Sequence, residues 1–262
     1  MRIAVLLKEV PDTYSDPEMS LETGLTDRTG DVVADEVGER AVEAALRLTE
    51  GVEGAVVDVI SVGPESVAGS IRKAIAMGAT DAYIVSDDAL VGADLTLTAE
   101  ALAAVVAKNG YDLVVTGAAS SDGGGGVMAS LVGEILDYPA LTNLTAMDLD
   151  GSTVRATQAG DGATVEFEAE LPAIVAVSDE FPDARFPNFK GLMAAKKKEL
   201  TTLSLADLAI DAEDWNRARS IMVSIERRPA RERGEIIDGN SQAAAKLVDF
   251  LQDKDLLPRS RA

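Results

Sequence analysis

Apolar residues follow two alternating spacings along the first half of the chain. Short continuous apolar runs are typical of buried strands, and apolar residues three and four positions apart are typical of helices. The strand-like runs lie at 3–7, 56–62, 82–86 and from 112 onward. The helical stretches lie at 36–50, 64–77, 95–108 and from 127 to 135. Strands that alternate with helices in this order predict a parallel sheet with right-handed crossovers.

The pattern changes after residue 140. Residues 141–170 alternate between apolar and polar and contain the turn signals Asp150-Gly151 and Asp161-Gly162, which predicts an antiparallel meander. A further turn signal at 27–30 predicts a hairpin within residues 15–34. Residues 172–177 return to a buried strand, and 241–251 have helical spacing. The predicted fold is α/β, a doubly wound and mostly parallel sheet with a β-meander.

A glycine-rich loop follows the strand that begins at Asp112. The loop contains Gly123, Gly124, Gly125 and Gly126 and leads into a helical stretch. Strand, glycine turn and helix start form an arrangement that binds phosphate through backbone N–H groups. No Gly-Lys-Ser/Thr ending and no Lys or Arg occur between Tyr111 and Ala140, so we expect backbone amides only. This indicates a nucleotide that is held rather than hydrolysed; a flexible loop is the alternative.

Composition removes several classes of function. The 262 residues include no Cys and no His, which excludes a Cys nucleophile, a disulfide, a zinc cluster, an iron–sulfur site and a Ser-His-Asp triad. The net charge of −21 argues against nucleic acid as a ligand. No apolar stretch of about 18 residues and no signal-peptide pattern occur, so we expect a cytoplasmic protein without membrane insertion.

Charge is distributed unevenly. Residues 1–190 hold 11 Lys and Arg against 33 Asp and Glu, whereas residues 191–262 hold 13 against 12. A long, nearly neutral tail with apolar residues suggests an arm that packs on another chain. A self-packed terminal helix is the alternative.

The run Asp183-Ala184-Arg185-Phe186-Pro187-Asn188-Phe189-Lys190-Gly191-Leu192-Met193-Ala194-Ala195-Lys196-Lys197-Lys198-Glu199 is the most distinctive in the chain. Taken alone, it reads as a solvated basic helix end. It also resembles the recognition loop and Ala-Lys-Lys-Lys stretch of the β subunit of electron-transfer flavoprotein.

The resemblance to this family covers roughly residues 1–205. The opening Val5-Leu6-Leu7-Lys8-Glu9-Val10-Pro11-Asp12 is similar to its first strand and loop, and Asp35-Glu36-Val37-Gly38-Glu39-Arg40-Ala41-Val42 to its first helix. Ser61-Val62-Gly63-Pro64, Ile71-Arg72-Lys73-Ala74, the glycine loop and Leu171-Pro172-Ala173-Ile174-Val175 also align. Several motifs in one order make the match specific.

The resemblance implies a sheet of the adenine-nucleotide-binding type in a domain of residues 1–205, with a recognition loop at 183–198, and an extended C-terminal arm at 206–262 on a flavin-bearing α subunit. It implies AMP contacts at Leu6, Asp35, Glu36, Val37, Gly38, Val62, Gly117, Ala118, Ala119, Ser120, Ser121, Asp122, Gly123, Gly124, Gly125, Gly126, Val127 and Met128. The FAD of the α subunit is expected against Asp12, Thr13 and Val37. Phe189 is the expected docking anchor, with Leu192 and Met193 beside it.

An electron carrier, not an enzyme, is the implied function. The subunit would take electrons from acyl-CoA or other flavoprotein dehydrogenases and pass them to a quinone oxidoreductase. The alternatives are a bifurcating-type subunit with a second FAD in the AMP site, and a nucleotide-binding stress-type module. Three departures from the family pattern stand out: Asp35-Glu36 for Asn-Pro, Gln158-Ala159 for an Arg-Glu pair, and glycines for the acids after Asp122.

Overall fold

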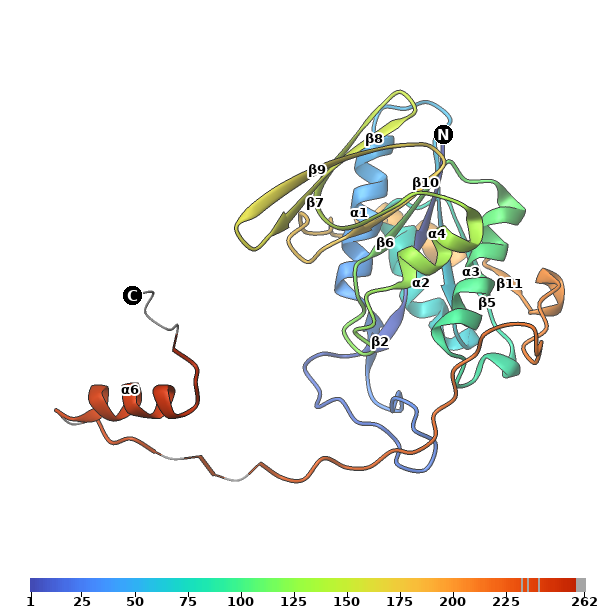
Figure 1. Ribbon diagram of the computed structural model, residues 1–262. Helices are drawn as coiled ribbons and strands as arrows, with labels where there is room; N and C mark the ends of the chain where they lie inside the picture. The colour runs from blue at the N-terminus through green and yellow to red at the C-terminus, as the bar shows by residue number, and fades with distance from the viewer. Residues whose placement is uncertain (232, 235, 240, 258–262) are drawn as a thin grey trace. The chain divides into compact units, whose positions relative to one another are not determined.

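The computed structural model describes residues 1–231, 233–234, 236–239 and 241–257, and it divides into two units. The first unit is Met1–Ile225 and the second begins at Glu226. The first unit is built on a sheet of nine strands in the order β11-β5-β4-β1-β6-β10-β7-β8-β9 (Figure 1).

The strands of this sheet are β1 Arg2–Leu6, β4 Val56–Val62, β5 Asp81–Val85, β6 Leu113–Gly117, β7 Ala140–Asp150, β8 Thr153–Gly160, β9 Ala163–Glu170, β10 Ala173–Val177 and β11 Thr201–Leu203. From β11 to β7 each neighbouring pair is parallel. The β7–β8 and β8–β9 pairs are antiparallel and form the meander, drawn in yellow in Figure 1. The expected α/β class, the parallel sheet and the meander are confirmed.

Two helical layers cover opposite faces of the sheet. The helices of the first unit are α1 Glu36–Thr49, α2 Ala68–Met77, α3 Leu95–Asn109, α4 Met128–Leu136 and α5 Phe189–Lys197. One core cluster joins α1 and α2 to the sheet through side chains such as Val5, Val42 and Ile71. The other joins α3 and α4 through Ile60, Val105 and Val132. Successive strand residues point to opposite faces, so the buried runs fill both cores.

A small antiparallel pair lies outside the main sheet. It consists of β2, Glu9–Pro11, and β3, Val32–Ala34. The hairpin turn predicted at 27–30 is wrong, because the chain reverses between the bridged residues Met19 and Thr26. Asp27 instead forms a local turn by accepting a hydrogen bond from the Thr29 N–H at 2.8 Å.

Helix α5 packs against α2, and one glycine makes the close approach possible. A Cβ on Gly191 would overlap the carbonyl oxygen of Ala76. Arg72 of α2 donates to the carbonyl oxygens of Ala195 and, at 2.8 Å, Lys198. The chain then forms β11, which extends the sheet beside β5. Sequence patterns did not predict this last strand.

The segment after β11, up to Ile225, belongs to the first unit and packs on α3 and the residue before it. Arg219 donates to both carboxylate oxygens of Glu100 on α3, at 3.0 and 2.7 Å. The Ser220 N–H donates to Asp94 at 2.5 Å. The proposed boundary at residue 205 stays a prediction.

The second unit contains the predicted C-terminal helix as α6, Ala243–Asp253. Leu247, Val248 and Phe250 on this helix remain between 39% and 49% exposed. Whether this surface packs on another chain stays a prediction. Within the part of the chain that the structure describes, no helix has the length and apolar character to cross a membrane.

Candidate nucleotide site

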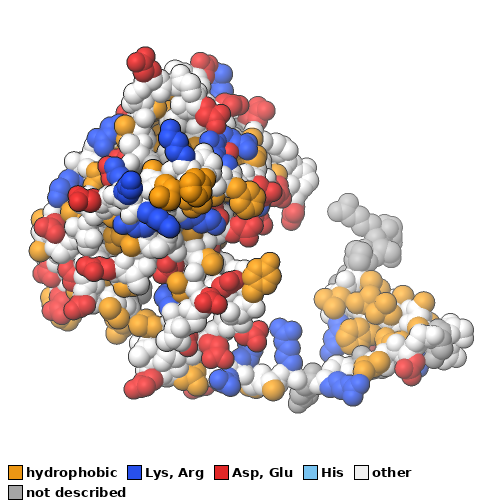
Figure 2. Space-filling model, turned by 180° about the vertical axis from the view of Figure 1, so that it is seen from behind, with side chains coloured by type: hydrophobic (Ala, Val, Ile, Leu, Met, Phe, Trp, Pro, Cys, Tyr) orange, Lys and Arg blue, Asp and Glu red, His pale blue; other side chains and the backbone are white. Residues whose placement is uncertain are grey.

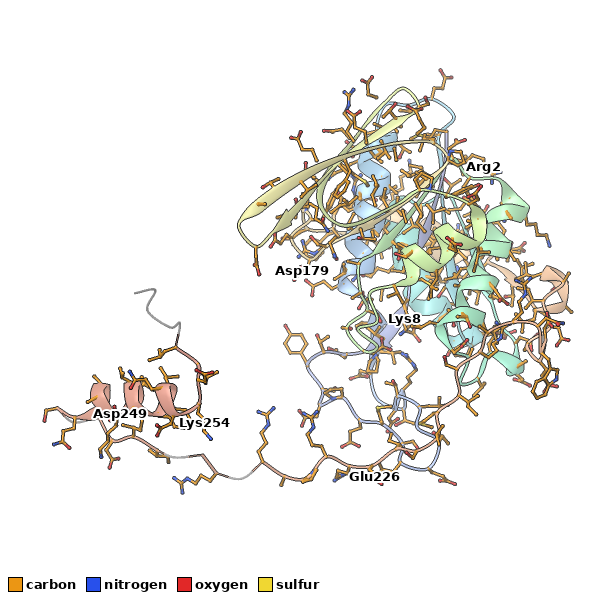
Figure 3. All side chains as sticks on the ribbon, viewed as in Figure 1. Arg2, Lys8, Asp179, Glu226, Asp249 and Lys254 are labelled. Carbon is orange, nitrogen blue, oxygen red and sulfur yellow. The ribbon has the colours of Figure 1, made fainter. Side chains whose placement is uncertain are left out.

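A cavity of about 1020 Å³ opens at the carboxyl ends of β1, β4 and β6. Strand β1 runs from Arg2 at one end of the sheet toward Lys8 at the other, where the cavity lies (Figure 3). The chain leaves β1 toward β4 on one side and reaches β6 on the other, so strand order reverses here. In open parallel sheets this edge is where ligands bind.

The glycine loop forms one wall of this cavity. Strand β6 ends at Gly117, and α4 begins at Met128 without a side-chain cap on its first turn. Helix N-termini leave backbone N–H groups without intrahelical acceptors. A Cβ on Gly117 would lie 3.1 Å from the backbone carbon of Val37, so glycine lets β6 approach the start of α1. The wall thus combines closely packed backbone at Gly117 with N–H groups at the start of α4 that have no side-chain cap, as a phosphate site requires.

Asp35 connects the glycine loop to α1. It is 3% exposed, caps α1 by accepting from the Gly38 N–H at 3.3 Å, and accepts from the Ser121 N–H at 3.0 Å. Each carboxylate oxygen therefore has a backbone donor. The Asp that replaces the usual Asn at this position can serve as a structural acceptor.

Two cations from distant parts of the sequence reach the glycine loop. Lys8 contacts one carboxylate oxygen of Asp122 at 2.6 Å, and Arg28 contacts the other at 2.5 Å. Both cations line the cavity, in addition to the backbone amides that we expect there. Which of these groups contact a nucleotide stays a prediction. Loop residues 12–31 and the end of β1 supply the charge that the loop itself lacks.

Asp122 is held as a carboxylate by these contacts. Its side chain is only 5% exposed, and burial alone would raise its pKa. The hydrogen bonds from Lys8, Ser120 and Arg28 outweigh burial and lower the pKa to about 2. At neutral pH the cluster of Lys8, Arg28 and Asp122, called the charge cluster below, therefore carries one net positive charge.

The structure brings most of the expected AMP residues to the cavity wall. Those that line it are Leu6, Asp35, Gly38, Val62, Gly117, Ala118, Ala119, Ser120, Gly125, Gly126, Val127 and Met128. Those that lie outside the lining are Glu36, Val37, Ser121, Asp122, Gly123 and Gly124. Glu36 points to solvent, with its side chain 81% exposed, and pairs with Arg40 at 3.6 Å. For all the expected AMP residues, contact with the nucleotide itself stays a prediction.

The wall also contains residues that were not among the expected AMP contacts. They include Lys8, Arg28, Glu65, Asp87, Asp88 and Leu95. Asp87 and Asp88 follow the carboxyl end of β5, so the strand-end rule could have found them. Arg28 lies in an irregular loop, and no local pattern in the sequence relates it to the glycine loop.

The expected flavin-facing residues lie after β2 and at the start of α1, outside the cavity lining. Asp12 follows β2, and its N–H donates to the Asp31 carbonyl at 2.9 Å. Thr13 is exposed, and Val37 is half-buried at the start of α1. Nothing in the single chain brings a flavin to them, so this role stays a prediction.

The docking segment (residues 183–198) is a loop followed by helix α5. Asn188 caps the helix by accepting from the Gly191 N–H at 2.8 Å. Phe189, in the first turn, is 80% exposed. The alternative interpretation as a basic helix end is correct about the local structure, with Lys196 and Lys197 in the last turn.

Phe189 is not a lone exposed aromatic. Phe186 is 95% exposed, and Leu192 and Met193 are 45% and 43% exposed. Figure 2 shows hydrophobic side chains close to Lys and Arg on one face of the first unit. Exposed apolar side chains that gather beside charged residues can form a protein-binding surface.

An ion-pair network fixes the start of the docking segment. Arg185 donates to Glu43 on α1 at 2.6 and 3.1 Å and to Glu50 at 2.6 Å. Arg47 also contacts Glu43, at 2.7 Å. Burial would raise the pKa of Glu43, but the bonds from Arg185 and Arg47 lower it to about 2. Glu43 thus ties the segment to the core of the first unit.

Comparison with known proteins identifies the family of this chain. Residues 23–208 match the electron transfer flavoprotein domain family. The chain is 37% identical over 258 residues to the electron transfer flavoprotein subunit beta of Mycobacterium tuberculosis (strain ATCC 25618 / H37Rv), covering 95% of this chain and 97% of the relative. The subunit beta of Bacillus subtilis (strain 168) is 30% identical over 259 residues, covering 97% and 98%.

A third relative has a different name. The caffeyl-CoA reductase-Etf complex subunit CarD of Acetobacterium woodii is 30% identical over 264 residues, covering 98% of this chain and 100% of the relative. The matches thus span nearly the whole chain and share one family. The chain therefore belongs to the electron transfer flavoprotein family, as a β subunit of an electron carrier.

Proposed function

We propose that this chain holds AMP as a structural ligand while a partner α subunit carries the redox-active FAD. The cavity at the carboxyl ends of β1, β4 and β6 carries this proposal. It combines glycine-loop backbone, an uncapped helix start and two cations, which together suit a nucleotide phosphate. The sequence contains no His and no Cys, which agrees with a subunit that positions groups rather than reacting with them.

The docking segment supplies the second half of the proposal. Phe189 is the anchor for acyl-CoA or other flavoprotein dehydrogenases, with Leu192 and Met193 beside it. Aromatic side chains are enriched in the cores of protein interfaces, and Phe189 is exposed enough to enter one. Electrons from the dehydrogenase pass to the FAD of the α subunit, with Asp12, Thr13 and Val37 against it, and then to a quinone oxidoreductase. This places the subunit in fatty acid β-oxidation.

The experiment is to express the chain with its α subunit, denature the purified heterodimer and identify the released nucleotides by mass. The proposal predicts one AMP and one FAD per heterodimer. A heterodimer without AMP would contradict the structural role of the cavity.

A bifurcating-type subunit is the second candidate, with FAD in place of AMP in the cavity. Two observations favour it: the similarity to the A. woodii subunit, and a cavity volume at the top of the range for small-molecule sites. The same experiment separates the two, because this candidate predicts two FAD and no AMP. A nucleotide-binding stress-type module receives no support from these relatives.

A further inference from the structure

The charge cluster places a carboxylate directly behind the two cations that face the cavity. Lys8 and Arg28 line the cavity, whereas Asp122 does not. Their side chains are 45% and 36% exposed, against 5% for Asp122. The cations can therefore reach a ligand, and the carboxylate reduces the charge that they present.

Asp122 is also fixed in position. One oxygen accepts from Lys8 and from the Gly123 N–H, both at 2.6 Å, while the other accepts from Arg28 at 2.5 Å. Arg28 donates as well to the Glu9 carbonyl at 2.9 Å, which holds its guanidinium beside the loop. Hydrogen bonds thus connect the three charges to one another and to the backbone.

The charge of the cluster decides how much phosphate charge it can balance. A nucleoside monophosphate carries about two negative charges at neutral pH, and a diphosphate carries one more. Charges separated by a few ångström in a partly buried site interact strongly, and salt screens them only in part. With Asp122 ionised, the cluster offers a single net positive charge, so it stabilises the additional charge of a diphosphate less than two uncompensated cations would.

We propose that Asp122 is a specificity-determining residue: by balancing one of the two cations, it lowers the affinity of the cavity for a nucleoside diphosphate relative to the monophosphate. This rests on the proposed function, in which the cavity holds AMP. Asp122 acts through Lys8 and Arg28, because it lies outside the cavity lining. Removing its charge frees a cation for a second phosphate, and removing Lys8 has the opposite effect.

The test compares heterodimers that carry the parent chain, Asp122→Asn or Lys8→Gln. Each is incubated with equal concentrations of isotope-labelled AMP and ADP, separated from free nucleotide and denatured, and the bound ADP:AMP ratio is measured by mass. Asp122→Asn raises this ratio at least tenfold, and Lys8→Gln lowers it below the parent value. Asp150→Asn is the matched control, because Asp150 pairs with Arg155 at 3.0 Å on the exposed meander. Its ratio equals that of the parent.

The outcomes distinguish the two proposals. A parent heterodimer that binds AMP, together with an Asp122→Asn ratio within twofold of the parent, would overturn the selectivity role alone. A parent that binds neither nucleotide would overturn the proposed function and this inference with it. If Asp122→Asn does not assemble, Lys8→Gln decides: a ratio at or above the parent value overturns the role of the cluster.

Discussion

Replacing Glu43 by Gln should weaken the attachment of the docking segment to α1 and lower the free energy of unfolding. Glu43 is 3% exposed and accepts hydrogen bonds from Arg185 and Arg47. Gln closely imitates the protonated carboxyl in size and shape. The loss at neutral pH therefore approximates the free energy that the native structure gains from the charged form.

The magnitude follows from the pKa of Glu43. The contacts lower it from 4.5 to about 2, and each unit corresponds to about 1.36 kcal/mol, so the charged form contributes about 3 kcal/mol. Because the folded pKa is depressed, this contribution is present above the ordinary value of 4.5 and is lost as pH falls through about 2. About 2 kcal/mol of it is lost by pH 3.

The assay is urea unfolding of the purified protein at pH 7 and pH 3, followed by circular dichroism. Glu43→Gln should be less stable than the parent by about 3 kcal/mol at pH 7, and by much less at pH 3. Glu50→Gln is the matched control, because Glu50 also pairs with Arg185 but is 62% exposed, and such pairs contribute about 0–1 kcal/mol. A gap below about 1 kcal/mol at pH 7, or an equal gap at both pH values, would refute the reasoning.

Three further predictions address function. Phe189→Ala should slow dehydrogenase-dependent flavin reduction at least tenfold, the kinetic equivalent of about 1.4 kcal/mol, and leave reduction by dithionite unchanged; equal loss in both assays would make Phe189 structural. Gly125→Val, whose Cβ lies in ordinary contact 3.5 Å from Leu95, should lower AMP content and melting temperature by blocking the cavity wall. Gly124→Val should lower AMP content and melting temperature more than Gly151→Val in the meander, which introduces similar backbone strain because the two glycines have φ of +58° and +62°. Equal effects of the two substitutions would mean that backbone strain alone causes the loss. The isolated chain should be colourless and the heterodimer yellow, and a stoichiometric flavin spectrum from the isolated chain would favour the bifurcating-type candidate.

Local patterns predicted the parts of the fold in which local and global structure agree. The apolar runs of β1, β4 and β6 are buried on both faces of the sheet, and the glycine loop lies between β6 and α4 as expected. Short strands such as β11 were missed, because three residues carry too little periodicity. Their position depends on α5 packing against α2, which sequence spacing does not encode.

The candidate site likewise has features that the sequence predicts and features that it does not. The backbone elements of the cavity could be placed from strand ends and glycines. The charge cluster could not, because Lys8 and Arg28 lie 114 and 94 residues from Asp122 in the sequence. Likewise, the family resemblance pointed to Phe189, but nothing in the sequence indicated that Phe186 is exposed. The exposure of Phe186 depends on the path of the loop before α5.

The most direct test of the account is an experimental structure of the heterodimer purified with its own nucleotide. The account predicts AMP in the cavity, with its phosphate within hydrogen-bonding distance of the glycine-loop amides and facing Lys8 and Arg28. An empty cavity, AMP bound elsewhere, or an isoalloxazine ring in the cavity would contradict it.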